Sequence, residues 1–112
     1  MNDKDKSNLL GMLDFALRVN KRMADVSKDS FLYDLDLQDA VLYALGQLGE
    51  KTNGLSEDFI GANPSKVWYK LKGLRNRIFH SYEDINLNMI YEIIKTDIDK
   101  IIKLLKELSE QA

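Results

Sequence analysis

Apolar residues recur every three or four positions along almost the whole chain of 112 residues, and this spacing is the strongest constraint on its fold. A repeat of that length places apolar side chains along one side of an α-helix. No segment shows the sustained alternation of a β-strand, and only one proline, Pro64, is present to interrupt a helix. We therefore predict one all-α domain over residues 1–112.

Four main helices with short connections are expected to form an antiparallel bundle. Their expected ranges are 7–24, 36–51, 63–80 and 87–108. Asp36 is the expected N-cap of the second helix, and Asn63 followed by Pro64 is the expected start of the third. Residues 27–35 are expected to form a packed loop or short turn, and Ser56 to cap another short turn.

The composition excludes several classes of protein. The chain has no cysteine, which excludes disulfides and thiolate metal sites, and its single histidine cannot build a histidine zinc site. We expect neither a metal nor a cofactor. The first seven residues are mostly polar, and no apolar run approaches the roughly 20 residues that span a bilayer. We expect a cytoplasmic protein with no membrane association.

Positive charge is concentrated in one segment. Between positions 66 and 77 the basic residues are Lys66, Lys70, Lys72, Arg75 and Arg77. Taking these five from the 16 basic residues of the chain leaves 11 against 18 acidic residues, a net charge of −7. A local cationic segment on an acidic chain suits an anionic ligand such as a phosphodiester, although a solvated helix face is the plain alternative.

The only histidine, His80, lies at the end of this segment. Imidazole in its unperturbed state can both take and give a proton near neutral pH. At 100° per residue, the apolar positions of this helix centre about 300° from Arg75, whereas His80 and Asn76 lie at about 140° and 100°. Both therefore point away from the core, and they can meet as an i,i+4 pair. An idle surface histidine is the alternative, and Tyr82 by itself indicates packing at a helix end.

Arg75, His80 and Tyr82 together form an Arg-x4-His-x-Tyr pattern, with the polar Asn76 directly after the arginine. With this pattern the chain resembles the HEPN superfamily, in particular its HepT-like toxin branch. Further matches cover most of the chain, at positions 39–41, 48–50, 64–68, 73–76, 85–86 and 90–91. Two departures are a Lys-Val-Trp ending at Trp68, where the family usually has Ile-Pro-Trp, and few alanines after Glu50.

The resemblance implies a homodimeric, metal-independent ribonuclease toxin whose two motifs converge in one cleft, with RNA as substrate. It also implies an antitoxin partner, a small MNT-type (MntA-like) nucleotidyltransferase that transfers AMP from ATP to Tyr82. In this interpretation His80 is the general acid or base and Arg75 binds the phosphoryl oxygens. Asn76 orients His80 or binds substrate, and Lys72 and Arg77 position the RNA backbone.

Two other hypotheses remain open on the sequence. The chain can be a non-catalytic HEPN module that binds a nucleotide or a substrate for a partner nucleotidyltransferase. It can also be a helical dimer with a structural role only. A titratable histidine within the motif favours the nuclease, because a module that only binds has no need of one.

Overall fold

Six α-helices and one 3₁₀ turn make up residues 1–111, the part of the chain that the computed structural model describes. In order they are α1 (Asp3–Met23), α2 (Lys28–Tyr33), α3 (Leu35–Asn53), α4 (Glu57–Ala62), α5 (Lys66–His80), the turn η1 (Tyr82–Asp84) and α6 (Leu87–Glu110). No β-strand occurs within these residues, so the predicted all-α fold is confirmed.

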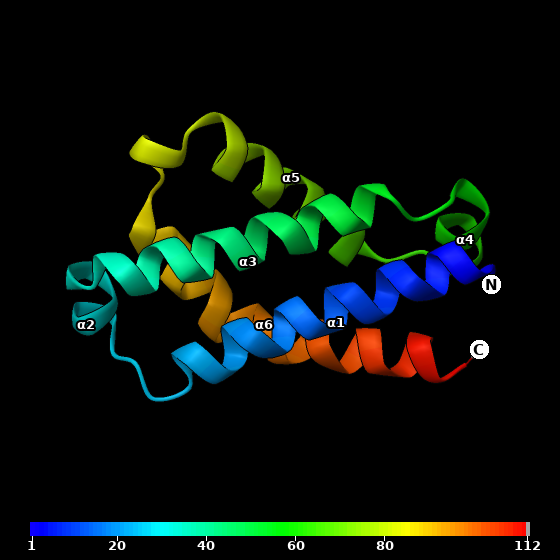
Figure 1. Ribbon diagram of the computed structural model, residues 1–112, viewed down its shortest axis with the longest axis horizontal. Helices are drawn as coiled ribbons and strands as arrows, with labels where there is room; N and C mark the ends of the chain where they lie inside the picture. Colours follow the sequence, from blue (N-terminus) through cyan, green and yellow to red (C-terminus); the bar gives the residue numbers. More distant parts are fainter. Residues whose placement is uncertain (112) are drawn as a thin grey trace.

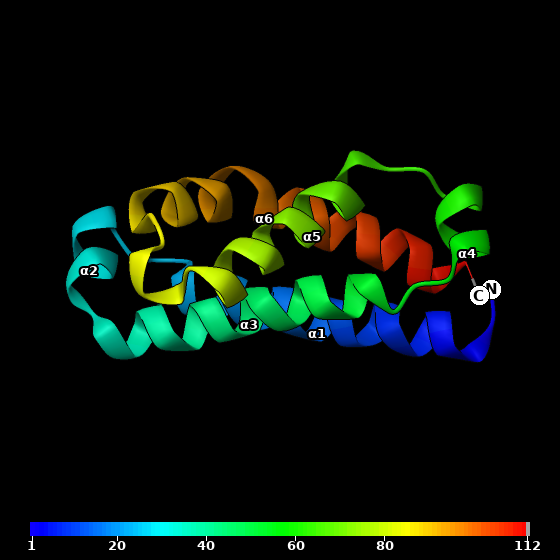
Figure 2. The same cartoon turned by 90° about the horizontal axis from the view of Figure 1, so that it is seen from above.

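The four longer helices run antiparallel to their neighbours in the bundle (Figure 1). Helix α1 packs against both α3 and α6, and α5 packs against the other side of α3. The short helices α2 and α4 lie at opposite ends of the bundle (Figures 1 and 2). The result is an elongated molecule of 42 × 28 × 20 Å. Within residues 1–111 every helix is too short or too polar to cross a bilayer.

The core is built from the apolar stripes that the spacing predicts. Its fully buried side chains include Leu9, Met12, Val19, Phe31, Leu45, Leu48, Leu71, Ile78, Ile90, Ile94 and Leu105. Removing each such side chain from water contributes about 1.5–3 kcal/mol. Because α5 takes part through Trp68, Leu71, Leu74 and Ile78, its other side remains at the surface.

Helix starts were harder to predict than helix interiors, and the predicted start of α5 was wrong. Ser65, rather than Asn63, caps this helix, with its Oγ accepting from Val67 N over 3.2 Å. Asn63 is occupied elsewhere: its carbonyl accepts from Trp68 Nε1 over 2.9 Å and its side-chain amide donates to Phe59. Pro64 therefore precedes the cap instead of opening the helix.

Other expected boundaries shift by a few residues. Helix α3 begins at Leu35 because Asp34, and not Asp36, accepts from Leu37 N over 3.0 Å. The segment expected to be a loop contains helix α2, which Ser27 caps. Helix α1 begins four residues early, where Asn2 caps it. The prediction for Ser56 is confirmed, since its Oγ accepts from Phe59 N at the start of α4.

Two glycines on α3 let α5 pack closely against it. A Cβ at Gly49 would lie 2.4 Å from Arg75 Cβ and 2.5 Å from the Leu71 carbonyl oxygen. A Cβ at Gly46 would lie 2.7 Å from Cε1 of Phe79. All three distances are shorter than ordinary contacts between heavy atoms. At Gly49 the obstructing atoms are a backbone oxygen and a Cβ, so only glycine permits this approach. The contact fixes how far the end of α5 stands from α3.

The close approach can be tested by adding a single methyl group. Gly49→Ala is expected to lower the free energy of unfolding by about 1–3 kcal/mol, because backbone and Cβ atoms cannot move aside. Gly73→Ala on α5 is the matched control, since its Cβ meets nothing within 4 Å. That change is expected to raise stability by about 0.5–1 kcal/mol through helix propensity. Urea unfolding that gave both variants the same shift would contradict the packing described.

Candidate functional site

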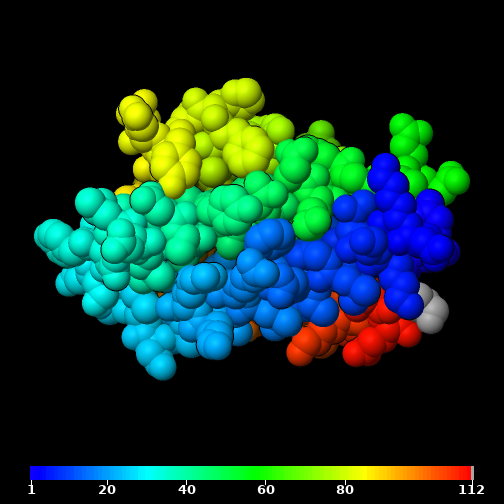
Figure 3. Space-filling model, in the orientation of Figure 1, coloured from blue at the N-terminus to red at the C-terminus, as the bar shows by residue number. Residues whose placement is uncertain are grey.

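The candidate residues lie along the last turns of α5 and the turn that follows. Helix α5 ends at His80, where Ser81 N donates back to the Arg77 carbonyl over 2.9 Å. Tyr82 then opens η1. In the space-filling view the end of α5 and the turn after it, coloured yellow and yellow-green, rise above α3 (Figure 3). The motif is therefore presented on the surface and is not enclosed in the bundle.

Arg75 is held in one orientation by three neighbours. Its Nε donates to Glu50 Oε2 over 2.7 Å, and its Nη1 donates to Asn76 Oδ1 over 3.0 Å. Its guanidinium carbon lies 4.4 Å from the centre of the Phe79 ring. A surface ion pair of this kind adds little stability, about 0–1 kcal/mol. Its effect is to fix the plane and direction of a permanent positive charge.

Tyr82 is tied to the first turns of α3. Its Oη donates to Asp39 Oδ1 over 2.8 Å, although 43% of the residue is exposed. Partial burial and this hydrogen bond to a carboxylate both raise the pKa of the phenol above its usual value near 10. The phenol is therefore a neutral hydrogen-bond donor at physiological pH.

His80 and Asn76 are both exposed, as the helical angles predict. The expected pairing between them is not seen within residues 1–111, where Asn76 accepts its hydrogen bond from Arg75. The structure thus brings Arg75 and Tyr82 against α3 and leaves Asn76 and His80 on the outer side of α5.

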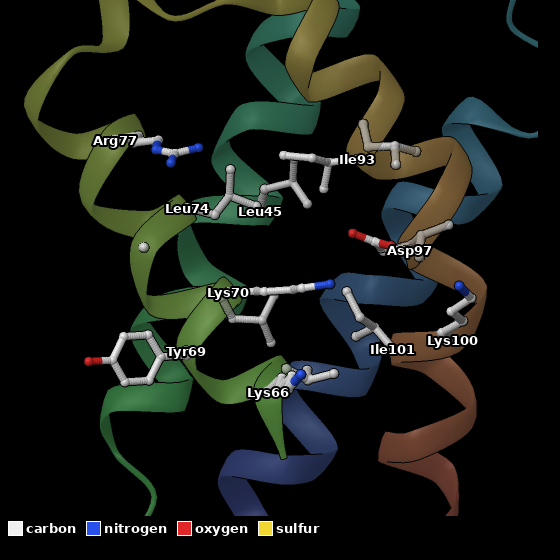
Figure 4. A pocket seen from close by; sticks show the side chains of 15 residues that line it. Leu45, Lys66, Tyr69, Lys70, Leu74, Arg77, Ile93, Asp97, Lys100 and Ile101 are labelled. Carbon is white, nitrogen blue, oxygen red and sulfur yellow. The ribbon is translucent and has the colours of Figure 1, made fainter.

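The two basic residues expected to position a backbone lie on different sides of α5. Arg77 faces α6, with Nη1 3.3 Å from the Met89 sulfur (Figure 4). Lys72 is half-buried and lies about 140° away around the helix. Any chain of phosphates that meets both must therefore cross the outer surface of α5.

Sequence reasoning assigned no role to Asp39 or Glu50, the two acids of α3 that hold the motif. They are 11 residues apart, which is three helical turns, so they lie within about 20° of one face. Gly46 and Gly49 lie between them in the sequence, where α5 approaches most closely. Acids spaced by whole turns around small residues were the available signal. Only the contact with α5 shows that these acids bind Arg75 and Tyr82.

An apolar groove lies elsewhere on the molecule. A groove of about 700 Å³ separates α5 from α6, with a floor of leucine and isoleucine side chains (Figure 4). Lys66, Lys70, Arg77 and Lys100 lie at its rim, together with Asp97. Of the candidate residues only Arg77 lines it, so this groove and the Arg75 site are separate features. Residues 1–111 hold no group of three or more side chains suited to a metal ion.

An all-α bundle with Arg-x4-His-x-Tyr at the exposed end of a helix defines a HEPN domain. The family model described as "Ribonuclease HepT-like" matches residues 12–108, and the chain belongs to that family. Similar proteins include "Putative RNase MJ0127" of Methanocaldococcus jannaschii, 36% identical over 77% of this chain and 69% of that protein. "Putative RNase MJ1380" of the same organism is 31% identical over 88% and 90% of the two chains.

"Probable ribonuclease HepT" of Thermococcus cleftensis is 26% identical over 69% of this chain and 70% of its own length. Among solved structures, none matches the chain significantly.

The hydrogen bond between Tyr82 and Asp39 predicts a titration. Asp39→Asn is expected to lower the pKa of Tyr82 toward 10 but not fully to it, because burial of the ring persists. Since the pKa of Tyr82 is raised in the folded state, the linked stability is complete below pH 10 and is lost as pH rises through the native pKa. Nuclear magnetic resonance of labelled tyrosine measures this value, with Tyr82→Phe identifying the signal. An unchanged titration in Asp39→Asn would show that the carboxylate has no influence.

Proposed function

We propose that this protein is a metal-independent endoribonuclease that acts as the toxin of a toxin–antitoxin pair. The observation that carries the proposal is the geometry at the end of α5. There an oriented guanidinium, Arg75, and an exposed imidazole, His80, lie five residues apart on one short helix. Membership of the HepT-like family, whose relatives carry ribonuclease names, supports it.

RNA contains the nucleophile for its own cleavage. The 2′-hydroxyl attacks the adjacent phosphorus, the bond to the 5′-oxygen breaks, and the products are a 2′,3′-cyclic phosphate and a 5′-hydroxyl. His80 takes the proton of the attacking hydroxyl or gives one to the leaving oxygen. Arg75 stabilises the charge that builds on the phosphoryl oxygens, for which its planar fork is suited. Asn76 keeps that fork in place, and Lys72 and Arg77 contact neighbouring phosphates.

The same chemistry favours a homodimer. In-line cleavage without a metal uses both an acid and a base, yet each chain has one histidine. Two copies supply two histidines at one cleft. The side of the molecule that bears Arg75 also exposes large apolar side chains, with Tyr43 at 60%, Phe79 at 46% and Tyr82 at 43%. A second copy of the chain packed there would cover them.

In this proposal a nucleotidyltransferase antitoxin silences the toxin at Tyr82. The phenolic oxygen attacks the α-phosphorus of ATP, pyrophosphate leaves, and the hydroxyl proton is released. The modified oxygen has no proton to donate to Asp39, and the added phosphodiester brings a negative charge toward that carboxylate and toward Arg75. Modification therefore breaks the contact that holds η1 on α3 and places a nucleotide where RNA would bind.

The proposal is tested by RNA cleavage with purified protein. The wild type is expected to cut single-stranded RNA in the presence of EDTA and to leave 2′,3′-cyclic phosphate ends. His80→Ala and Arg75→Ala are each expected to lose roughly 10²–10⁴-fold in rate. Lys103→Ala, an exposed residue in the second half of α6, is the matched control and should retain full activity. A wild type that binds RNA and never cuts it would instead favour a non-catalytic module.

Glu50 provides a separate test of positioning. Glu50→Ala is expected to lower kcat roughly 10- to 100-fold, because the Arg75 fork loses its fixed direction. Stability should fall by no more than about 1 kcal/mol, as for other exposed ion pairs. Glu50→Gln, which still accepts a hydrogen bond from Nε, should keep more activity than the alanine variant. Equal activity in all three proteins would show that Arg75 needs no support from α3.

A further inference from the structure

The outer side of α5 carries a continuous line of exposed residues that begins far from the motif. Tyr69, Gly73, Asn76 and His80 follow one another at steps of four, three and four, and all are exposed. Measured around the helix from Arg75, they lie between about 100° and 160°. One straight surface therefore leads from Tyr69 to the candidate catalytic histidine.

Tyr69 is placed as a platform at the far end of this line. It is 87% exposed, and although Tyr69 is among the residues that line the groove between α5 and α6, its ring points outward from the groove (Figure 4). Large aromatic side chains are normally buried against a core, as the neighbouring Trp68 is at 3% exposure. The surface next to it is open at Gly73, where an added Cβ would meet no atom within 4 Å.

Positive charge flanks this line on both sides. Lys66, Lys70 and Arg77 lie on the side toward α6, and Lys72 lies on the side toward α3. Helix α5 itself has no acidic residue. Acids also lie near this line: Glu50 is bonded to Arg75, Asp97 lines the groove on the α6 side, and Glu83 and Asp84 follow His80 in η1. An exposed ring among cations of this spacing complements a polyanion that carries flat apolar rings.

We infer that the outer side of α5 is a track for single-stranded RNA, on which Tyr69 stacks against an unpaired nucleobase. This inference rests on the proposed function and adds to it a subsite that binds a nucleobase away from the bond being cut. The flanking lysines and Arg77 contact phosphates, and the phosphate to be cut lies at the His80 end. Tyr69 and His80 are 11 residues apart, about 16 Å along the helix. The stacked base therefore belongs to a nucleotide that is not adjacent to the bond being cut.

An unpaired base is required by the geometry of stacking. In duplex RNA both faces of every base are already covered, whereas an exposed aromatic ring needs a free face. Stacking contacts the face of a base and not its hydrogen-bonding edge, so the contact requires a base without favouring one kind of base. The track should therefore discriminate single strands from duplexes and should show little preference for sequence.

The experiment measures binding apart from cleavage by using the full-length chain with His80→Ala. The probe is a fluorescein-labelled single-stranded RNA of 12 nucleotides with mixed sequence. The comparison probe has the same backbone with abasic sites. Adding Tyr69→Ala is expected to weaken binding of the intact RNA about 5-fold or more, since a base stacked on an aromatic ring contributes about 5- to 150-fold. Tyr69→Phe should bind as the parent does. In the active chain, Tyr69→Ala should raise KM and leave kcat unchanged.

Tyr33→Ala is the matched control, because Tyr33 is also 87% exposed but lies at the end of α2. It should bind the intact RNA with unchanged affinity, and the abasic strand should bind equally weakly with or without Tyr69. Equal losses for Tyr33→Ala and Tyr69→Ala, or a loss that is the same for the abasic strand, would overturn the inference. If the wild type cuts RNA and Tyr69→Ala changes neither binding nor KM, this inference alone fails. If binding depends on Tyr69 but the chain never cuts RNA, only the proposed nuclease activity fails.

Discussion

The close contact between α3 and α5 is the interaction on which the site depends. Gly46 and Gly49 lack the side chains that would hold the helices apart, so the backbone of α5 lies close to Gly49 and the Phe79 ring lies close to Gly46. This approach brings Arg75 within hydrogen-bonding distance of Glu50 and lets η1 reach Asp39. The two glycines thereby allow side chains of α3 to orient the guanidinium of Arg75 and the phenol of Tyr82. The hydrogen bonds contribute little to stability, and their consequence is geometric.

Helix α5 then carries three surfaces with different tasks. Its apolar side packs into the core through residues such as Leu71 and Ile78. The side toward α3 holds Arg75 and, through the following turn, Tyr82. The outer side presents His80 at one end and Tyr69 at the other. A helix of 15 residues can serve all three because its side chains return to the same face every three or four positions.

The fold was largely predictable from the sequence, because apolar spacing alone fixes which side of each helix is buried. The same reasoning placed His80 and Asn76 at the surface. Helix starts were less predictable, since several side chains can cap and the choice depends on tertiary contacts. Asn63 shows this: it was a good candidate cap, but the indole of Trp68 and the end of α4 engage it instead.

The site was predictable only in part. The Arg-x4-His-x-Tyr pattern lies within one segment, so sequence spacing reveals it. Asp39 and Glu50 are 43 and 25 residues away from their partners, and their spacing along α3 does not say which residues they contact. Tyr69 was overlooked, although the helical angles that place His80 at the surface place Tyr69 there as well, about 120° around the helix from Arg75.

The central claim is that two copies of the chain share one cleft, each contributing an imidazole and a guanidinium. The most direct measurement is the activity of a fixed amount of wild type refolded from urea together with increasing His80→Ala chain, with RNA in excess over all protein. A shared cleft predicts that activity falls toward zero as wild-type chains pair with inactive partners. Constant activity throughout would show that each chain cuts RNA by itself, and would contradict the account.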